Sequence, residues 1–292
     1  MTGPPTVPGA THRTVTIATA DAGPLDLNVL EAGSGPPVLM LHGWPQHSGC
    51  WRKVIPLLSD SYRLICPDLR GFGWSGAPGQ GSDPETFAAD AIALLDALEL
   101  DRVRLVGHDW GGYAAFLLAL GWPQRIERML VLNTGQPWIE TSPRSALSLW
   151  RLWYVVVLAT LGERIALNRP DLIARALRAD YAHPEGITAI DAAAYAERLR
   201  TPAAAHATKL LYRSYLRTFA GVVLGRAEQA GRLTVPTHFL FGTRDRALST
   251  DILRGIEDHA DQLEVELVRD SGHFIAEEKP ELVAARARTL FA

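Results

Sequence analysis

A glycine-rich turn at residues 107–112 carries the side chain best placed for nucleophilic chemistry. The stretch Gly-His-Asp-Trp-Gly-Gly follows the apolar run 103–106 and precedes a helical pattern. A strand, a sharp turn and a helix in this order are typical of a nucleophile elbow, in which glycines allow close backbone approach and the central side chain points outward. That central residue is Asp109. An ordinary turn in which Asp109 caps the next helix is the alternative without catalysis.

An aspartate in this position favours attack on saturated carbon over the hydrolysis of peptides or esters. A carboxylate with a reference pKa of about 3.9 is already ionised at neutral pH. Its attack on an ester would give an anhydride, whereas its attack on an electrophilic sp³ carbon gives a stable alkyl ester that activated water can cleave. The sequence therefore predicts cleavage of a carbon–oxygen or carbon–halogen bond.

Two residues nearer the C-terminus are predicted to act with Asp109. His273 stands in Ser-Gly-His-Phe (271–274), after the last predicted strand, and Asp245 directly follows the predicted strand 237–242. The order along the chain is then nucleophile, acid and base. We expect Asp245 to orient the imidazole of His273 and to stabilise its charged form. A turn aspartate and a surface histidine are the alternatives, but Asn133 occupies the other place for such an acid, which favours Asp245.

The stretch His-Gly-Trp-Pro at residues 42–45 predicts an oxyanion-binding loop. The backbone N–H groups of Trp44 and Trp110 are expected to hold the second oxygen of Asp109, and later the oxyanion formed when water attacks the ester. We expect His42 to support the shape of this loop, because the general base is already assigned to another histidine.

An alternation of strands and helices must position these residues. Short β-branched or leucine-rich runs alternate with amphipathic segments, which is typical of an α/β fold with a mostly parallel sheet and helices on both faces. Strands are predicted over 15–18, 25–30, 37–41, 62–66, 103–107, 129–132, 237–242 and 263–268, the first two as a hairpin. Helices are predicted over 51–58, 87–98, 113–120, 252–256 and 281–291.

One long segment interrupts the alternation. Between residues 136 and 232 there is no convincing strand, and helices are predicted over 150–161, 172–179, 192–199 and 206–219. We interpret this segment as a lid over the carboxyl edge of the sheet, where open α/β sheets bind ligands. The predicted division is a core of residues 1–135 and 233–292 and a lid of residues 136–232. Ordinary crossover helices are the alternative, although crossover connections are usually shorter.

Four motifs together resemble those of the epoxide hydrolases of the α/β-hydrolase fold. They are the stretches 42–45, 107–112 and 271–274 given above and Asp-Leu-Arg-Gly-Phe-Gly-Trp-Ser at residues 68–75. The resemblance spans nearly the whole chain and is weakest in the lid. It implies an eight-stranded, mostly parallel sheet with a helical lid inserted after the sixth strand. It also implies a cis peptide between Trp44 and Pro45, and a bracing role for Asp68 and Arg70.

The resemblance further implies two lid tyrosines directed at the epoxide oxygen. Tyrosine, with a pKa of about 10, can donate a proton or hydrogen bond while it stays neutral. Tyr212, followed by arginine, and Tyr154, seven residues before Leu161-Gly162, match the two positions. Leu161 replaces the proline of the family, and a glutamine-containing stretch is missing. Aromatic packing is the alternative, with Trp153, Tyr181, Tyr195 and Tyr215 as neighbouring rivals. The predicted substrate-binding residues are Trp44, Trp110, Trp153, Tyr154 and Tyr212.

Composition limits the partners and the location of the protein. The chain has 292 residues, 47% of them hydrophobic, which is enough for a large core. The net charge of −3 and the scattered charges make neither nucleic acid nor an anionic membrane an expected partner. The apolar stretch 153–161 is far too short to span a membrane, and the first residues lack a secretory signal. Two cysteines, Cys50 and Cys66, fit a reduced setting, so we expect a cytoplasmic enzyme.

The sequence therefore predicts an epoxide hydrolase that converts a small apolar epoxide to a vicinal diol without metal or organic cofactor. A haloalkane or haloacid dehalogenase with the same triad is the alternative. Haloalkane dehalogenases commonly have asparagine at the place of Trp44, and fluoroacetate-type enzymes have arginines just after the nucleophile, where this chain has Trp110, Gly111 and Gly112. A non-catalytic ligand receptor on the same fold is a third interpretation. The sequence leaves the oligomeric state open, a homodimer included.

Overall fold

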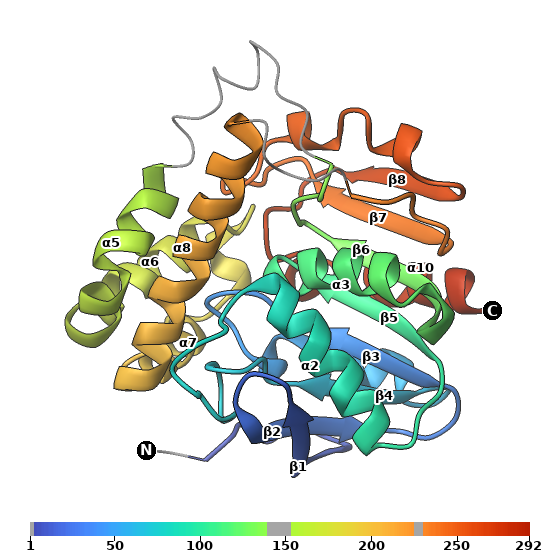
Figure 1. The fold of residues 1–292 in the computed structure, drawn as a ribbon, viewed down its shortest axis with the longest axis horizontal. Helices are drawn as coiled ribbons and strands as arrows, with labels where there is room; N and C mark the ends of the chain where they lie inside the picture. Colours follow the sequence, from blue (N-terminus) through green and yellow to red (C-terminus); the bar gives the residue numbers. More distant parts are fainter. Residues whose placement is uncertain (1–2, 139–152, 225–229) are drawn as a thin grey trace.

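A twisted sheet forms the centre of the molecule in a computed structural model that describes residues 3–138, 153–224 and 230–292 (Figure 1). Within these residues the sheet has eight strands in the order β1-β2-β4-β3-β5-β6-β7-β8. The pairs β1–β2 and β2–β4 are antiparallel, and the other neighbours are parallel. The strands are β1 (Ala10–Thr19), β2 (Gly23–Ala32), β3 (Pro37–Leu41), β4 (Arg63–Pro67), β5 (Val103–His108), β6 (Ile126–Leu132), β7 (Thr237–Gly242) and β8 (Leu263–Val268).

All eight predicted strands are confirmed. The bounds of β3, β7 and β8 agree with the prediction, and the opening hairpin is longer than predicted because both of its strands extend beyond their apolar runs. Alternate residues of each strand point to opposite faces of a sheet. Leu39 and Leu41 of β3 thus pack with α2 (Pro84–Ala97) and α3 (Trp110–Gly121), whereas Val38 and Met40 pack with α1 (Ile55–Leu58) and α10 (Pro280–Phe291). Helices therefore cover both faces, as predicted.

Two of the helix predictions are wrong in detail. The segment predicted as one helix over 51–58 contains the end of a 3₁₀ turn (Ser48–Trp51) and the four-residue helix α1. Pro56 lies in the first turn of α1, and a proline prevents a helix from continuing through it from the N-terminal side. The segment predicted over 252–256 is split between two 3₁₀ turns, Thr250–Leu253 and Ile256–His259, because Gly255 adopts a left-handed conformation.

Among the described residues between β6 and β7 there are four α-helices, which we call the lid helices. They are α5 (Trp153–Asn168), α6 (Pro170–Ala179), α7 (Ala189–Arg198) and α8 (Pro202–Val223). They gather at one side of the sheet, where α5 and α8 run along each other (Figure 1). Each overlaps a predicted helix, although residues 150–152 of the first prediction lie outside the described residues. The lid bounds of 136 and 232 stay a prediction.

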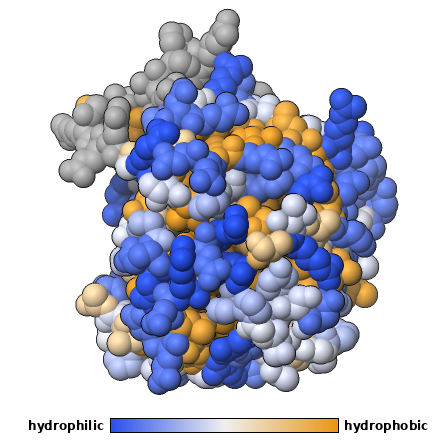
Figure 2. Space-filling model, turned by 90° about the vertical axis from the view of Figure 1, so that its right-hand side faces the viewer, coloured by the Kyte–Doolittle hydropathy of each residue, from blue (hydrophilic) through white to orange (hydrophobic). Residues whose placement is uncertain are grey.

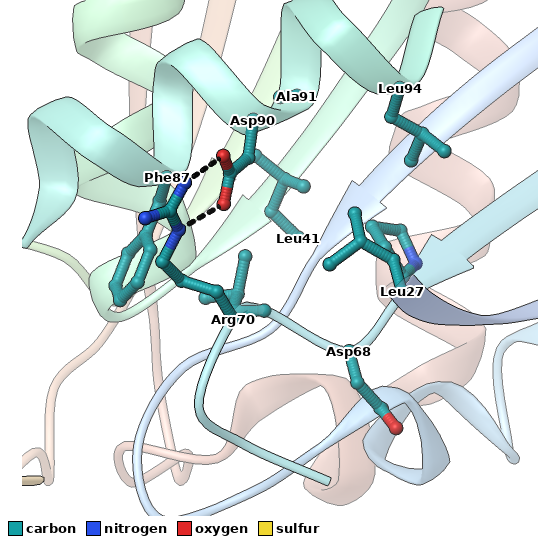
Figure 3. A pocket seen from close by; sticks show the side chains of 10 residues that line it. Leu27, Leu41, Asp68, Arg70, Phe87, Asp90, Ala91 and Leu94 are labelled. Atoms are coloured by element: carbon teal, nitrogen blue, oxygen red, sulfur yellow. Dashed lines mark hydrogen bonds and ion pairs between the residues drawn. The ribbon is translucent and has the colours of Figure 1, made fainter. Parts of the chain in front are cut away.

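The loop after β4 is braced by the two residues predicted for that task. The buried carboxylate of Asp68 accepts hydrogen bonds from the backbone N–H groups of Ser48 (2.7 Å) and Trp74 (2.9 Å). The guanidinium of Arg70 makes two hydrogen bonds to Asp90 of α2, at 2.6 and 2.5 Å, beside a very small cavity (Figure 3). The loop is thereby fixed to helix α2, and neither side chain is among those that line the large cavity described below.

The surface has the mixed character usual for a folded protein. On the face shown in Figure 2, hydrophilic and hydrophobic residues are intermingled. Within the described ranges, none of the helices combines the length and the hydropathy needed to cross a membrane. Both cysteines are buried and unpaired.

Candidate active site

Asp109 lies at a strained turn between β5 and α3. Its backbone dihedral angles are φ 51° and ψ −123°, a conformation that a non-glycine residue rarely adopts. Glycines let the neighbouring backbone approach this turn. A Cβ atom on Gly111 would overlap the carbonyl oxygen of His42, and one on Gly43 would overlap the carboxylate of Asp109. The predicted elbow is therefore present, with its central carboxylate half-buried at the carboxyl end of the sheet.

The loop after β3 contacts the Asp109 carboxylate through its backbone. The N–H of Trp44 donates to Oδ2 of Asp109 at 2.8 Å. Trp110 is the first residue of α3, so its amide has no acceptor within the helix. Among the hydrogen bonds of the described residues, none joins that amide to Asp109, and this half of the predicted pair stays a prediction. The peptide between Trp44 and Pro45 is cis, as the resemblance implies.

The three residues of the predicted triad come together in space. Nδ1 of His273 lies 2.8 Å from Oδ2 of Asp245, and its Nε2 lies 3.5 Å from Oδ1 of Asp109. Asp245 is held by two further donors, the Leu248 N–H at 2.8 Å and the Asn133 side-chain amide at 2.8 Å. The imidazole thus lies between two carboxylates, and Asn133 fixes the acid from the adjacent strand end.

The charges of these groups depend on one another. Burial alone would lower the pKa of His273, but the carboxylates of Asp245 and Asp109 raise that pKa well above its usual value. Burial alone would raise the pKa of Asp245, but His273 and the donors around the carboxylate lower it. With Asp109 ionised, the structure therefore favours an imidazolium between two carboxylates.

Two further buried histidines are bonded to the backbone of loops around the site. Nε2 of His42 accepts the Leu69 N–H at 2.9 Å, and its Nδ1 lies 3.0 Å from the carbonyl oxygen of Gly43, which agrees with a role in shaping this loop. Nε2 of His108 lies 2.8 Å from the carbonyl oxygen of His273. Burial, helped by the neighbouring His273, lowers the pKa of His108 to about 4, so it is neutral and can donate to that carbonyl. The sequence analysis did not assign a role to His108.

The two predicted tyrosines lie together above the elbow. The rings of Tyr154 and Tyr212 have centroids 6.3 Å apart, and Tyr212 packs edge-on against Trp44 (5.3 Å) and Trp110 (5.6 Å). Burial raises the pKa of both phenols well above the usual value, so both stay protonated at neutral pH. Tyr215 packs edge-on against Trp110 as well (5.6 Å).

The rival tyrosines of the lid have different surroundings. The hydroxyl of Tyr195 donates to Oε1 of Glu277 at 2.7 Å, and Tyr181 stacks on Phe274. Neither is among the residues that line the cavity over the elbow, whereas Tyr154, Tyr212 and Tyr215 are.

A cavity of about 750 Å³ joins the elbow to the lid helices. This volume is in the range usual for small-molecule sites. Most of its wall is apolar, and all five predicted substrate-binding residues line it, although the side chain of Trp153 is largely exposed. Asp180, which sequence reasoning missed, also lines the wall, and burial raises its pKa to about 6. Over the described part of the chain, no group of three or more His, Cys, Asp or Glu side chains is arranged to hold a metal ion.

An aspartate at a sharp strand–helix turn, a histidine bonded to a second aspartate and a mostly parallel sheet are together typical of hydrolytic enzymes of the α/β type. Residues 36–280 match the model of the family described as the alpha/beta hydrolase fold. The chain belongs to this family and is an enzyme of its hydrolytic class.

Several relatives are similar over much or nearly all of their length. The soluble epoxide hydrolase of Corynebacterium sp. (strain C12) is 30% identical over 283 residues, which are 91% of this chain and 93% of that protein. The fluoroacetate dehalogenase of Burkholderia sp. is 31% identical over 209 residues, 66% of this chain and 67% of that protein. The solved structure of the epoxide hydrolase CorEH without ligand has a TM-score of 0.79 and 28% identity, covering 97% of this chain and 98% of that one.

Proposed function

We propose that the chain is an epoxide hydrolase that opens a small apolar epoxide to a vicinal diol. The observation that carries the proposal is the arrangement around one mainly apolar cavity, in which Asp109 lies beside His273 and the lid tyrosines Tyr154 and Tyr212 line the same space. The similarity to proteins named epoxide hydrolase supports it. The mainly apolar wall supports an apolar substrate, and the cytoplasmic location stays a prediction.

The first step is the opening of the ring. Oδ2 of Asp109 is held by the Trp44 amide, which leaves Oδ1 to attack a ring carbon. The new bond between this oxygen and carbon forms as the bond between the same carbon and the ring oxygen breaks. The developing alkoxide takes a proton from one of the hydroxyls of Tyr154 and Tyr212 and a hydrogen bond from the other. The product of this step is an ester between Asp109 and the alcohol.

The second step is hydrolysis of that ester. Once Asp109 is esterified, it no longer carries the charge that helps to raise the pKa of His273. The imidazolium therefore loses its proton more readily, and this proton restores the tyrosine hydroxyl that was deprotonated in the first step. The neutral imidazole then takes a proton from water, while Asp245 keeps it oriented. Hydroxide adds to the ester carbonyl, and the oxyanion is held by the Trp44 amide. The bond between the carbonyl carbon and the substrate oxygen then breaks, and this oxygen takes the proton of the newly added hydroxyl group. The diol is released, and the carboxylate of Asp109 and the imidazolium of His273 are restored.

Dehalogenation by the same triad is the competing function. Haloalkane dehalogenases often have a tryptophan after the nucleophile whose indole N–H holds the halide, and Trp110 occupies that place here. At the place where they commonly have asparagine this chain has Trp44, whose indole N–H donates to the hydroxyl of Thr208 at 3.2 Å. The residues after the nucleophile are Trp110, Gly111 and Gly112, which offer no cation for a carboxylate substrate. Trp44 in place of asparagine and the missing cation favour epoxides, whereas Trp110 is shared with the dehalogenases. A panel of epoxides and haloalkanes assayed in parallel distinguishes the two, because halide release without diol formation would contradict the proposal.

Trapping the intermediate tests the two-step chemistry. With His273→Gln, we expect ring opening to proceed and ester hydrolysis to stop, so that the intact mass of the protein rises by one substrate molecule. His183→Gln, which replaces an exposed histidine, is the matched control and should turn over without an adduct. Absence of an adduct on the His273 variant, with an epoxide that the wild type consumes, would contradict the scheme.

A separate variant tests the interpretation of the chain as a non-catalytic receptor. A binding pocket has no need of an ionised Asp109 beside His273. With Asp109→Asn we expect turnover to be lost. If wild-type protein turned over neither epoxides nor haloalkanes, and Asp109→Asn left ligand affinity unchanged, the receptor interpretation would replace the proposed function.

A further inference from the structure

The loop that carries His273 is bonded to the lid through Glu278. Glu278 ends the short helix α9 (Ile275–Glu278). Its carboxylate accepts the Gly272 N–H at 3.0 Å with Oε1 and 3.1 Å with Oε2, and Oε2 accepts the Ala182 N–H at 2.8 Å. Gly272 directly precedes the catalytic histidine, whereas Ala182 follows α6 in the lid segment. One carboxylate therefore joins the backbone of the core loop to the backbone of the lid.

The backbone of the same two segments is also in direct contact. The N–H of His273 donates to the carbonyl oxygen of Asp180 at 3.0 Å. A Cβ atom on Gly272 would overlap this carbonyl oxygen, so only glycine allows the approach. The His273 loop is thus fixed to lid residues 180–182 by two consecutive amides, of which Glu278 orders the first.

We propose that Glu278 is a positioning residue that aligns His273 for the attack of water on the ester. The proposal rests on the proposed function, in which His273 acts as a base in the second step and has no proton to remove in the first. A carboxylate can accept both amides, whereas the side chain of glutamine offers one acceptor oxygen and turns an N–H₂ group toward a donor. Loss of this charge should therefore shift the imidazole and slow the second step selectively.

Single-turnover kinetics of Glu278 variants test the proposal. Enzyme in excess is mixed with styrene oxide, quenched at successive times and analysed by intact mass, which follows the rise and the decay of the alkyl-enzyme. For Glu278→Gln we expect the decay to be about 10- to 100-fold slower, the size of effect that a small misplacement of a catalytic group produces. The rise should stay within about twofold. Glu278→Asp keeps the charge and should recover part of the loss.

A matched control separates this effect from a general loss of structure. Glu281→Gln removes an exposed carboxylate three residues away, in the first turn of α10, and should leave the rise and the decay unchanged. An equal slowing of both steps in the Glu278 variants, or an unchanged decay, would overturn the positioning role. If Glu278→Gln does not fold, the same test is made with Glu278→Asp. A slower decay with an unchanged rise supports the positioning role, and an unchanged decay overturns it. A wild-type enzyme that forms no adduct yet consumes the epoxide would refute the proposed function instead.

Discussion

Replacing Tyr212 with phenylalanine removes one hydroxyl from the cavity and leaves the packing of the ring in place. The ring lies edge-on against Trp44 and Trp110, with centroids 5.3 and 5.6 Å away, and a phenylalanine ring can make the same contacts. Because burial holds the pKa of Tyr212 well above its usual value, the wild-type hydroxyl is protonated throughout the neutral range. The variant therefore tests the donor role with little effect on the fold.

The expected magnitude follows from one lost hydrogen bond to a charged oxygen. Such a bond contributes about 1.5 to 3 kcal/mol, and a tenfold change in rate corresponds to about 1.4 kcal/mol. Since Tyr154 still donates in the variant, ring opening should slow by about 10- to 150-fold rather than stop.

The rate of alkyl-enzyme formation under single-turnover conditions measures this effect directly. Tyr215→Phe is the matched control, because its ring packs on Trp110 from the same helix at the same centroid distance of 5.6 Å. The control should form the alkyl-enzyme at the wild-type rate. A rate for Tyr212→Phe within about twofold of wild type, or an equal loss in the control, would refute the assignment of Tyr212 as a donor.

Two predictions concern stability. Glu277→Ala should lower the free energy of unfolding by about 3 to 5 kcal/mol, because Oε1 of this buried carboxylate accepts Arg52 at 2.8 Å and Tyr195 at 2.7 Å. Urea unfolding measures the change, and a loss under about 1 kcal/mol would contradict this view of the pair. The lowered pKa of Asp245 contributes stability that is complete above its unfolded pKa of about 3.9 and is lost as the pH falls through the lower folded value. The stability difference between wild type and Asp245→Asn should therefore shrink below about pH 4, and a constant difference would be inconsistent with the ionised pair.

The proximity of Asp109, Asp245 and His273 could be predicted from the sequence because each of them follows a recognisable strand. Parallel strands end at one edge of the sheet, so residues just after β5 and β7 come close together without further information. Asp109 and Asp245 are placed in this way, and His273 follows β8 in the same manner. The spacing of the glycines in 107–112 also predicted the elbow, because glycine at these positions allows the strand and the helix to approach each other closely.

Other parts of the site leave no local pattern in the sequence. Glu278 binds the Gly272 and Ala182 amides, and Ala182 is remote in the chain, so its contact is fixed only by the docking of the lid. His108 is the last residue of β5, and nothing in the local sequence indicates its hydrogen bond to the His273 carbonyl. The prediction of one helix over 51–58 was wrong because it relied on the apolar periodicity of this segment. In the structure, Pro56 prevents a helix from running through the whole segment.

One turnover in heavy-oxygen water, with enzyme in excess over an epoxide, tests the covalent role of Asp109 most directly. If the carboxylate forms an ester and water attacks its carbonyl carbon, the solvent oxygen enters the Asp109 side chain and the diol takes an oxygen from the protein. We therefore expect the label in the peptide that contains residue 109 and unlabelled diol in the first cycle. Labelled diol together with an unlabelled Asp109 would contradict the account, because it would mean that water attacks the epoxide itself.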